Sequence, residues 1–135
     1  MQVQPVAPEH VYQVWPLVEA FFKAADKYSV GDCTVDQLKL QLVSGSHTLL
    51  VATENGKVMG AAAMSIVNTP NHRVANISSA GGKGIADKAV LAQVEAWAKM
   101  QGATKIRAWA KDAQARLYRQ KMGLNTATHV VEKLI

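Results

Sequence analysis

HRVANISSAGGKGIADKAVLAQVEAWAKMQG, residues 72–102, contains the local signals from which the arrangement of the whole chain follows. Arg73 to Ser79 consists largely of small and β-branched residues, which predicts a buried strand. Ile85 to Gln101 contains no Gly or Pro and is rich in Ala, Leu, Glu, Lys and Gln, which predicts a helix. The glycines between them are therefore expected at a strand-to-helix turn; they are Gly81, Gly82 and Gly84.

A turn of this kind is a suitable place for a phosphate group. Unpaired backbone N–H groups and the positive end of the helix dipole meet at a helix start, and glycines let a ligand approach the backbone closely. The nucleotide P-loop does not fit, because Lys83 is followed by Gly84 instead of Ser or Thr. The dinucleotide fingerprint does not fit either, because its glycine spacing and its acidic partner are missing. Such a glycine cluster is also typical of a plain turn, so both interpretations stay open.

Three segments together resemble one protein family. The stretch from Ser79 to Ala86 looks like the acetyl-CoA motif of the GNAT family of N-acetyltransferases, Gln/Arg-x-x-Gly-x-Gly/Ala. The stretch from Ala115 to Leu124 is similar to the Leu-Tyr-x-x-x-Gly-Phe signature of the same family. Met1 to Pro5, followed by Val14 to Leu17, resembles its first strand and first helix. The matches span nearly the whole chain in the family's order.

The resemblance implies a single α/β domain over residues 1–135 with the acyl-CoA N-acyltransferase fold. That fold has a mixed, mainly antiparallel sheet flanked by about four helices and splayed where CoA enters. The residue patterns agree: Thr34 and Gln37 form a capping box, and Asn55-Gly56 suits a tight hairpin turn. We expect strands at 1–6, 47–54, 57–67, 73–79, 104–110 and 126–135, and helices from Pro8, at 34–45, at 85–101 and at 112–122.

Length and composition narrow the class of protein. No apolar run approaches the roughly 20 residues that a membrane span requires, and no export leader is visible at the start of the sequence. Cys33 is the only cysteine, which excludes an internal disulfide and a zinc site built from cysteines. We therefore expect a cytoplasmic protein without a metal site.

The charge of the chain is basic, with a formal net charge of +5 and a pI near 9.5. The basic residues are scattered and are not interleaved with aromatic residues, so a nucleic-acid-binding module is the least supported interpretation. A polyanionic ligand such as CoA would also gain from a positive field. For most of these residues the simplest interpretation is a solvated basic surface.

The resemblance assigns roles to particular residues, with acetyl-CoA as the co-substrate. In the family, backbone groups of the fourth strand hold the pantetheine arm and polarise the carbonyl, and here these groups belong to Asn76, Ile77 and Ser78. Tyr118 matches the tyrosine that protonates the departing thiolate, although a packing tyrosine on an amphipathic helix would have the same pattern. The pyrophosphate is expected on the backbone N–H groups of Gly81, Gly82, Lys83, Gly84, Ile85 and Ala86.

The chain also departs from the family pattern. Ser79 stands where Gln or Arg is usual, which removes a long donor side chain. Lys111 and Asp112 lie near the place of the usual asparagine, and Leu124 replaces the usual phenylalanine. The predicted central strand carries no carboxylate that could act as a general base. Candidates by residue type alone are Glu54, His72, His47 and Asp32, and a water chain or an already neutral amine would also suffice.

Two functions follow from the resemblance. The first is acetyl-CoA-dependent acetylation of a primary amine on an unidentified acceptor, with Tyr28, Asp32 and Cys33 on the acceptor side. The second is a non-catalytic structural or accessory protein of the same fold. Residues 14–32 and 130–135 also resemble a branch of short acetyltransferase-like proteins of tailed phages, some encoded near virion genes. Virion proteins would then be the partners, and in either case pairing through the final strand would make a homodimer.

Overall fold

The computed structural model describes residues 1–84 and 87–135 and contains one five-stranded sheet. The strands lie in the order β1-β2-β3-β4-β5, with β1 to β4 antiparallel to their neighbours and β5 parallel to β4. The predicted mixed, mainly antiparallel sheet is therefore confirmed. The strands are β1 (Gln2–Val6), β2 (Thr48–Glu54), β3 (Lys57–Asn68), β4 (Arg73–Gly82) and β5 (Lys105–Ala108).

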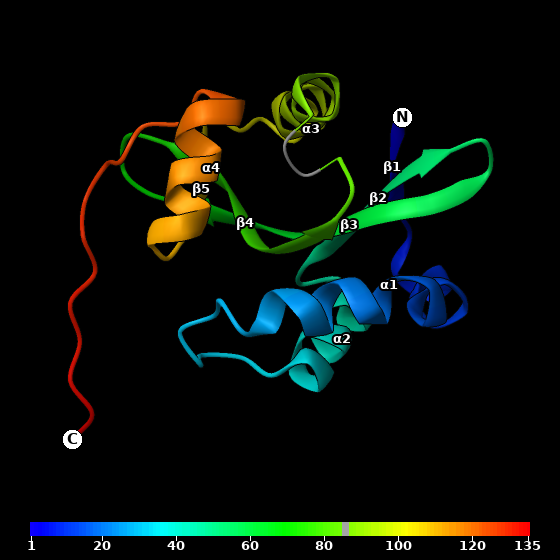
Figure 1. Ribbon diagram of the computed structural model, residues 1–135, viewed down its shortest axis with the longest axis horizontal. Coiled ribbons are helices and arrows are strands. Elements are labelled where there is room, and N and C mark those ends of the chain that lie inside the picture. Colours follow the sequence, from blue (N-terminus) through cyan, green and yellow to red (C-terminus); the bar gives the residue numbers. More distant parts are fainter. Residues whose placement is uncertain (85–86) are drawn as a thin grey trace.

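Helices cover both faces of the sheet. Figure 1 shows α1 and α2 on one face and α3 and α4 on the other. In the described part of the chain no helix combines the length and the apolar character that crossing a membrane requires. The helices are η1 (Pro8–His10), α1 (Val11–Asp26), α2 (Val35–Ser44), α3 (Lys88–Met100) and α4 (Asp112–Met122).

The core has two layers because side chains alternate across the sheet. On β2, Leu49 and Val51 point toward α1 and α2, where they join Val18 and Phe22 of α1. The other layer lies under α3 and includes Leu50 of β2 together with Met64, Ala75 and Val94. Both faces of the central strands are apolar, as the sequence predicts for strands covered by helices on both sides.

Two local motifs form as their residues require. Thr34 accepts a hydrogen bond from the Gln37 N–H at 3.1 Å, and the Gln37 side chain accepts one from the Thr34 N–H at 2.9 Å. This capping box starts α2. The β2–β3 turn places Asn55 at φ 51° and Gly56 at φ 76°, the left-handed conformation that these residue types tolerate.

The strand-to-helix unit has other boundaries than the sequence pattern indicates. The strand predicted to end at Ser79 continues to Gly82, because Gly81 and Gly82 still pair with β3. The first described residue of α3 is Lys88, with Asp87 as its N-cap, so a helix start at Ile85 is not supported; Ile85 and Ala86 themselves lie outside the described residues. A carboxylate is a strong helix cap, and Asp87 has the extended backbone conformation of an N-cap.

The prediction of a last strand at 126–135 is wrong. The structure assigns no strand to these residues, and Val130, Val131 and Leu134 are 55%, 91% and 98% exposed instead of buried. In Figure 1 the chain leads away from α4 along the outside of the molecule. A strand requires a partner for its backbone groups as well as a suitable pattern, and residues 126–135 have no strand partner among the described residues.

Candidate active site

The sheet opens between β4 and β5. The two strands pair from Val74 and Lys105 to Ile77 and Ala108, whereas β4 continues to pair with β3 as far as Gly82. From Ser78 onward, the side of β4 that faces β5 has no strand partner among the described residues. Backbone N–H and C=O groups in such a gap are free to bind a ligand that lies along the strand. Of the three predicted pantetheine-binding residues, Ser78 begins this open part, and Asn76 and Ile77 form the last pairs before it.

A β-bulge lies where the gap begins. Met64 of β3 pairs with Ile77, and the preceding Ala63 pairs with Ser79, so Ser78 is one extra residue in β4. Bulges bend a strand and turn a side chain away from its regular direction. The bulge and the splay therefore coincide at Ser78. The sequence pattern of β4 did not reveal the bulge, because its small residues fit a regular strand equally well.

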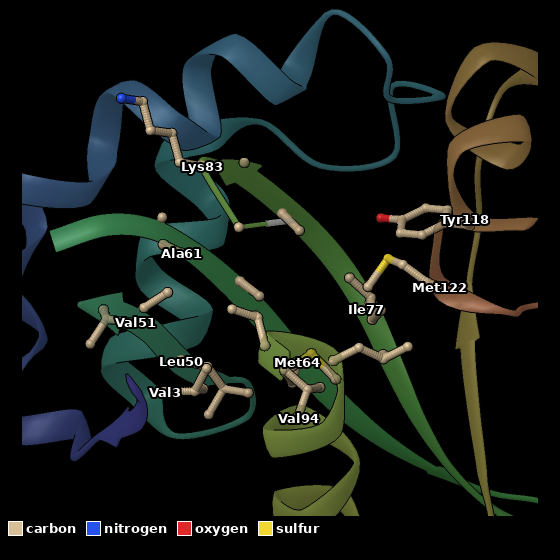
Figure 2. A pocket seen from close by; sticks show the side chains of 18 residues that line it. Val3, Leu50, Val51, Ala61, Met64, Ile77, Lys83, Val94, Tyr118 and Met122 are labelled. Carbon is tan, nitrogen blue, oxygen red and sulfur yellow. The ribbon is translucent and has the colours of Figure 1, made fainter. Parts of the chain in front are cut away.

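Tyr118 lies on α4 opposite the gap. Its side chain is 9% exposed, and Figure 2 shows the phenolic oxygen pointing from α4 toward β4. Burial raises the pKa of Tyr118 above its usual value of 10, so the phenol keeps its proton at neutral pH. Gly123 ends α4 at φ 70°, and the Leu124 N–H then donates to the Tyr118 carbonyl at 3.2 Å. A protonated phenol therefore lies at the opening.

A small, mostly apolar cavity of about 50 Å³ connects Tyr118 with the glycine segment. Figure 2 shows that its walls come from β1, β2, β3, β4, α3 and α4. Tyr118 and Met122 close it on the α4 side. The residues that line it near the gap are Ile77, Ala80, Gly81, Lys83, Gly84 and Leu91.

The glycines have a packing role in addition to the predicted ligand clearance. A Cβ on Gly81 would lie 2.5 Å from the Phe21 carbonyl oxygen of α1, and a Cβ on Gly82 would lie 2.5 Å from the Met59 carbonyl oxygen of β3. The Lys83 N–H donates to that same Met59 oxygen at 2.8 Å. The end of β4 is therefore held tightly between α1 and β3.

The start of α3 carries a carboxylate that the sequence interpretation did not consider. The Asp87 side chain accepts a hydrogen bond from the Ala89 N–H at 2.7 Å, and the Asp87 N–H donates to the Gly84 carbonyl at 3.0 Å. This carboxylate lies where the pyrophosphate is predicted to bind. Lys83 and Lys88, close to Asp87 in the sequence, are exposed and carry positive charge. Asp87 fits the common N-cap pattern, which could have identified it in the sequence.

A larger groove of about 1400 Å³ extends from the segment between α1 and α2 across β4 to α4. The predicted acceptor-side residues Tyr28, Asp32 and Cys33 line it together. Two of the four candidate bases, His47 and Asp32, also line it. The other two lie elsewhere: Glu54 is exposed at the β2–β3 turn, and the exposed His72 has its ring 3.0 Å from the Thr104 hydroxyl.

Besides Tyr118, which also lines this groove, two titratable groups here have shifted pKa values. Burial lowers the pKa of His47 below its usual 6.5, which favours the neutral imidazole. Burial raises the pKa of the Cys33 thiol, and the nearby carboxylates of Asp26 and Asp32 raise it further. Cys33 is therefore a protonated thiol at neutral pH and is poorly suited as a nucleophile.

The comparisons with known proteins agree with this geometry. The acetyltransferase (GNAT) family model matches residues 13–124. No curated protein matches the sequence. The fold is similar to a ribosomal-protein-alanine N-acetyltransferase from Brucella melitensis biovar Abortus 2308, with 13% identity, a TM-score of 0.68, and coverage of 100% of this chain and 99% of that one.

Two further solved structures share the fold. One is a predicted acetyltransferase with acetyl-CoA from Clostridium acetobutylicum, with 14% identity, a TM-score of 0.68, and coverage of 98% and 95% of the two chains. The other is an aminoglycoside acetyltransferase from an uncultured soil metagenomic sample, with 13% identity, a TM-score of 0.67, and coverage of 99% and 96%. Identities this low show the fold alone, whereas the family match spans most of the chain. The protein therefore belongs to the acetyltransferase (GNAT) family, whose enzymes transfer an acetyl group from acetyl-CoA.

Proposed function

We propose that this protein acetylates a primary amine, with acetyl-CoA as the donor and Tyr118 as the general acid. The observation that carries the proposal is the gap between β4 and β5, which begins at the Ser78 bulge and is faced by the Tyr118 hydroxyl. An extended thioester arm along β4 would place its carbonyl beside free backbone donors. Its sulfur would lie on the α4 side, within reach of the phenol.

The proposed residues divide the chemistry between them. Backbone groups at Asn76, Ile77 and Ser78 hold the pantetheine arm and polarise the thioester carbonyl. The amine nitrogen attacks this carbon, the C–N bond forms, and the C–S bond breaks. The departing thiolate takes the proton of Tyr118, whose raised pKa keeps that proton available.

The pyrophosphate of the donor would bind between β4 and α3. The proposed donors are backbone N–H groups of residues 81–86, with Lys83 and Lys88 as nearby cations. The Lys83 N–H already donates to Met59, so its use would require that hydrogen bond to open. The positive end of the α3 dipole supports anion binding here, and the Asp87 carboxylate opposes it.

Calorimetry with acetyl-CoA and thiol-release assays with a panel of primary amines test this function. Tyr118→Phe keeps the ring and removes the acid, so we expect binding within about threefold of the wild type and turnover lowered about 100-fold. Tyr12→Phe is the matched control, because Tyr12 is 58% exposed on α1 and should leave both values unchanged. A folded wild type that neither binds acetyl-CoA nor releases thiol would reject the enzyme and favour the non-catalytic alternative.

We further propose that residues 126–135 pair with a second copy of the chain, giving a homodimer. β5 is an edge strand, and Val131 and Leu134 are 91% and 98% exposed after α4. An open strand edge and an unpaired segment with exposed apolar side chains both favour strand addition between two chains. Light scattering should give the mass of a dimer, and a monomer at high concentration would contradict it.

A further inference from the structure

The small apolar cavity is larger than the transfer of an acetyl group requires. Its volume is about 50 Å³. One water-sized group needs about 10–15 Å³ of such space, so the cavity has room for about four of them. A methyl or methylene group is comparable in size to a water molecule, and an acetyl group has a single methyl beyond its carbonyl carbon. Protein cores have few voids larger than a water molecule, so this cavity requires an explanation.

The cavity lies over a row of paired residues in the sheet. Leu50 of β2 pairs with Ala62 of β3, which pairs with Ala80 of β4. All three lie in the core layer under α3 and line the cavity. Val90 and Val94 of α3 line it from the opposite side. Two alanines of the sheet therefore face two valines of the helix, and these short side chains leave the space between sheet and helix incompletely filled.

The cavity meets the larger groove beside the predicted site of chemistry. Four residues line both spaces: Ile77 of β4, Leu91 of α3, and Tyr118 and Met122 of α4. Ile77 directly precedes Ser78, where the bulge and the opening between β4 and β5 coincide. Figure 2 shows Ile77, Tyr118 and Met122 on the same side of the cavity. The methionine side chain is flexible, so Met122 can adjust the width of this passage. An acyl chain whose carbonyl lies at Ser78 would enter the cavity here.

Hydrogen bonds close the other end of the cavity. Val3 of β1 lines that end, on the opposite side of the sheet order from β4. The Val3 N–H donates to the Gln93 side-chain oxygen at 2.8 Å, and the Gln93 side-chain nitrogen donates to the Met1 carbonyl at 2.9 Å. Gln93 lies on α3, so these bonds hold the start of the chain against that helix. The cavity therefore has a fixed length, which limits the chain that fits.

The lining favours an apolar group. Among the described residues that line the cavity, polar side chains come from Lys83 and Tyr118. Figure 2 shows the Lys83 amine directed away from the other lining residues. The Tyr118 hydroxyl lies at the passage to the groove, so the inner part of the cavity offers no side-chain partner for a charge. Burial of an unpaired carboxylate is costly, which disfavours a dicarboxylic acyl group.

We propose that the acyl group of the donor enters this cavity, and that the protein transfers straight-chain apolar acyl groups of up to about four carbons. This inference rests on the proposed function and extends its donor from acetyl-CoA to butyryl-CoA. A neutral amine attacks the carbonyl carbon, the C–N bond forms, and the C–S bond breaks. Tyr118 protonates the departing sulfur, and the proton that the amine nitrogen loses returns to the phenolate.

Calorimetry of wild-type protein with acetyl-, butyryl-, hexanoyl- and succinyl-CoA tests the size and the polarity of the site. Each buried methylene contributes about fourfold in affinity, so the butyryl-CoA Kd should be about 15-fold lower than the acetyl-CoA Kd. Hexanoyl-CoA should bind no more tightly than butyryl-CoA, because its chain exceeds the cavity. Succinyl-CoA, with a chain of butyryl length that ends in a carboxylate, should bind more weakly than acetyl-CoA. Equal Kd values for acetyl- and butyryl-CoA, or a further gain for hexanoyl-CoA, would overturn the inference.

Two variants change the cavity in opposite directions. Ala62→Val fills it from the sheet with a residue that suits a strand, and should remove the advantage of butyryl-CoA over acetyl-CoA. Val94→Ala enlarges it from α3 and should extend the gain in affinity to hexanoyl-CoA. Ala20→Val makes the same chemical change as Ala62→Val at an exposed position of α1 and should keep the wild-type preference. A wild-type preference for butyryl-CoA in folded Ala62→Val would show that the acyl chain binds elsewhere.

Thiol release with a panel of primary amines separates this inference from the proposed function. In the wild type, kcat/KM should be higher with butyryl-CoA than with acetyl-CoA. Thiol release with acetyl-CoA but not with butyryl-CoA would overturn the acyl site and leave the acetyltransferase intact. A folded wild type that neither binds these donors nor releases thiol from them would overturn both.

Discussion

The Asp87 carboxylate at the start of α3 should weaken cofactor binding, and Asp87→Asn tests this directly. Asn caps helices about as well as Asp, so the hydrogen bond from the Ala89 N–H, now 2.7 Å, can be kept while the negative charge is removed. A pyrophosphate at the same helix start would lie about 5 Å from this carboxylate. At that separation one pair of charges repels by about 0.8 kcal/mol in water and about 3 kcal/mol at an effective dielectric of about 20.

Because Asp87 is exposed to solvent, we expect the repulsion to lie near the lower of these two energies. About 1 kcal/mol corresponds to an acetyl-CoA Kd about fivefold lower for Asp87→Asn than for the wild type. Calorimetry at about 0.05 M and about 1 M salt measures the acetyl-CoA Kd of both proteins. The difference between the two Kd values should shrink at high salt, because salt screens the repulsion. Asp36→Asn in the first turn of α2 is the matched control and should leave the Kd unchanged. An Asp87→Asn protein that binds acetyl-CoA no more tightly than the wild type would refute this placement of the pyrophosphate.

Three further outcomes are expected. Gly81→Ala should lower the free energy of unfolding by about 3 kcal/mol in urea titrations, because its Cβ would meet the Phe21 carbonyl oxygen at 2.5 Å, and wild-type stability would contradict the close packing. Burial lowers the pKa of His47, so the unfolded chain binds a proton more readily than the folded one. The free energy of unfolding should therefore fall as pH falls below about 6.5, and His47→Gln should flatten that dependence. Val131→Asp with Leu134→Asp should convert the proposed dimer to a monomer in light scattering, because both side chains are more than 90% exposed and available to a partner.

Much of the fold could be predicted because its signals are local. The Thr34–Gln37 capping box and the Asn55-Gly56 turn depend on residues within three positions of each other, and both form as expected. The order of strand, glycine segment and helix in residues 72–102 was also correct. Their boundaries were less accurate, because Gly81 and Gly82 lie in β4 through pairing with β3, a strand from elsewhere in the chain.

The site depends on register, which no local pattern specifies. The sequence identified Tyr118 and Ser78 as candidates, but the bulge at Ser78 arises only from the way β3 and β4 pair. The four candidate bases were equal by residue type, and only the tertiary structure places His47 and Asp32 on the larger groove and Glu54 and His72 away from it. Residues 126–135 show the opposite case, where an apolar pattern lacks a strand to pair with. Short-range backbone and capping preferences are encoded in neighbouring residues, whereas the gap and the bulge exist only once strands distant in sequence have paired.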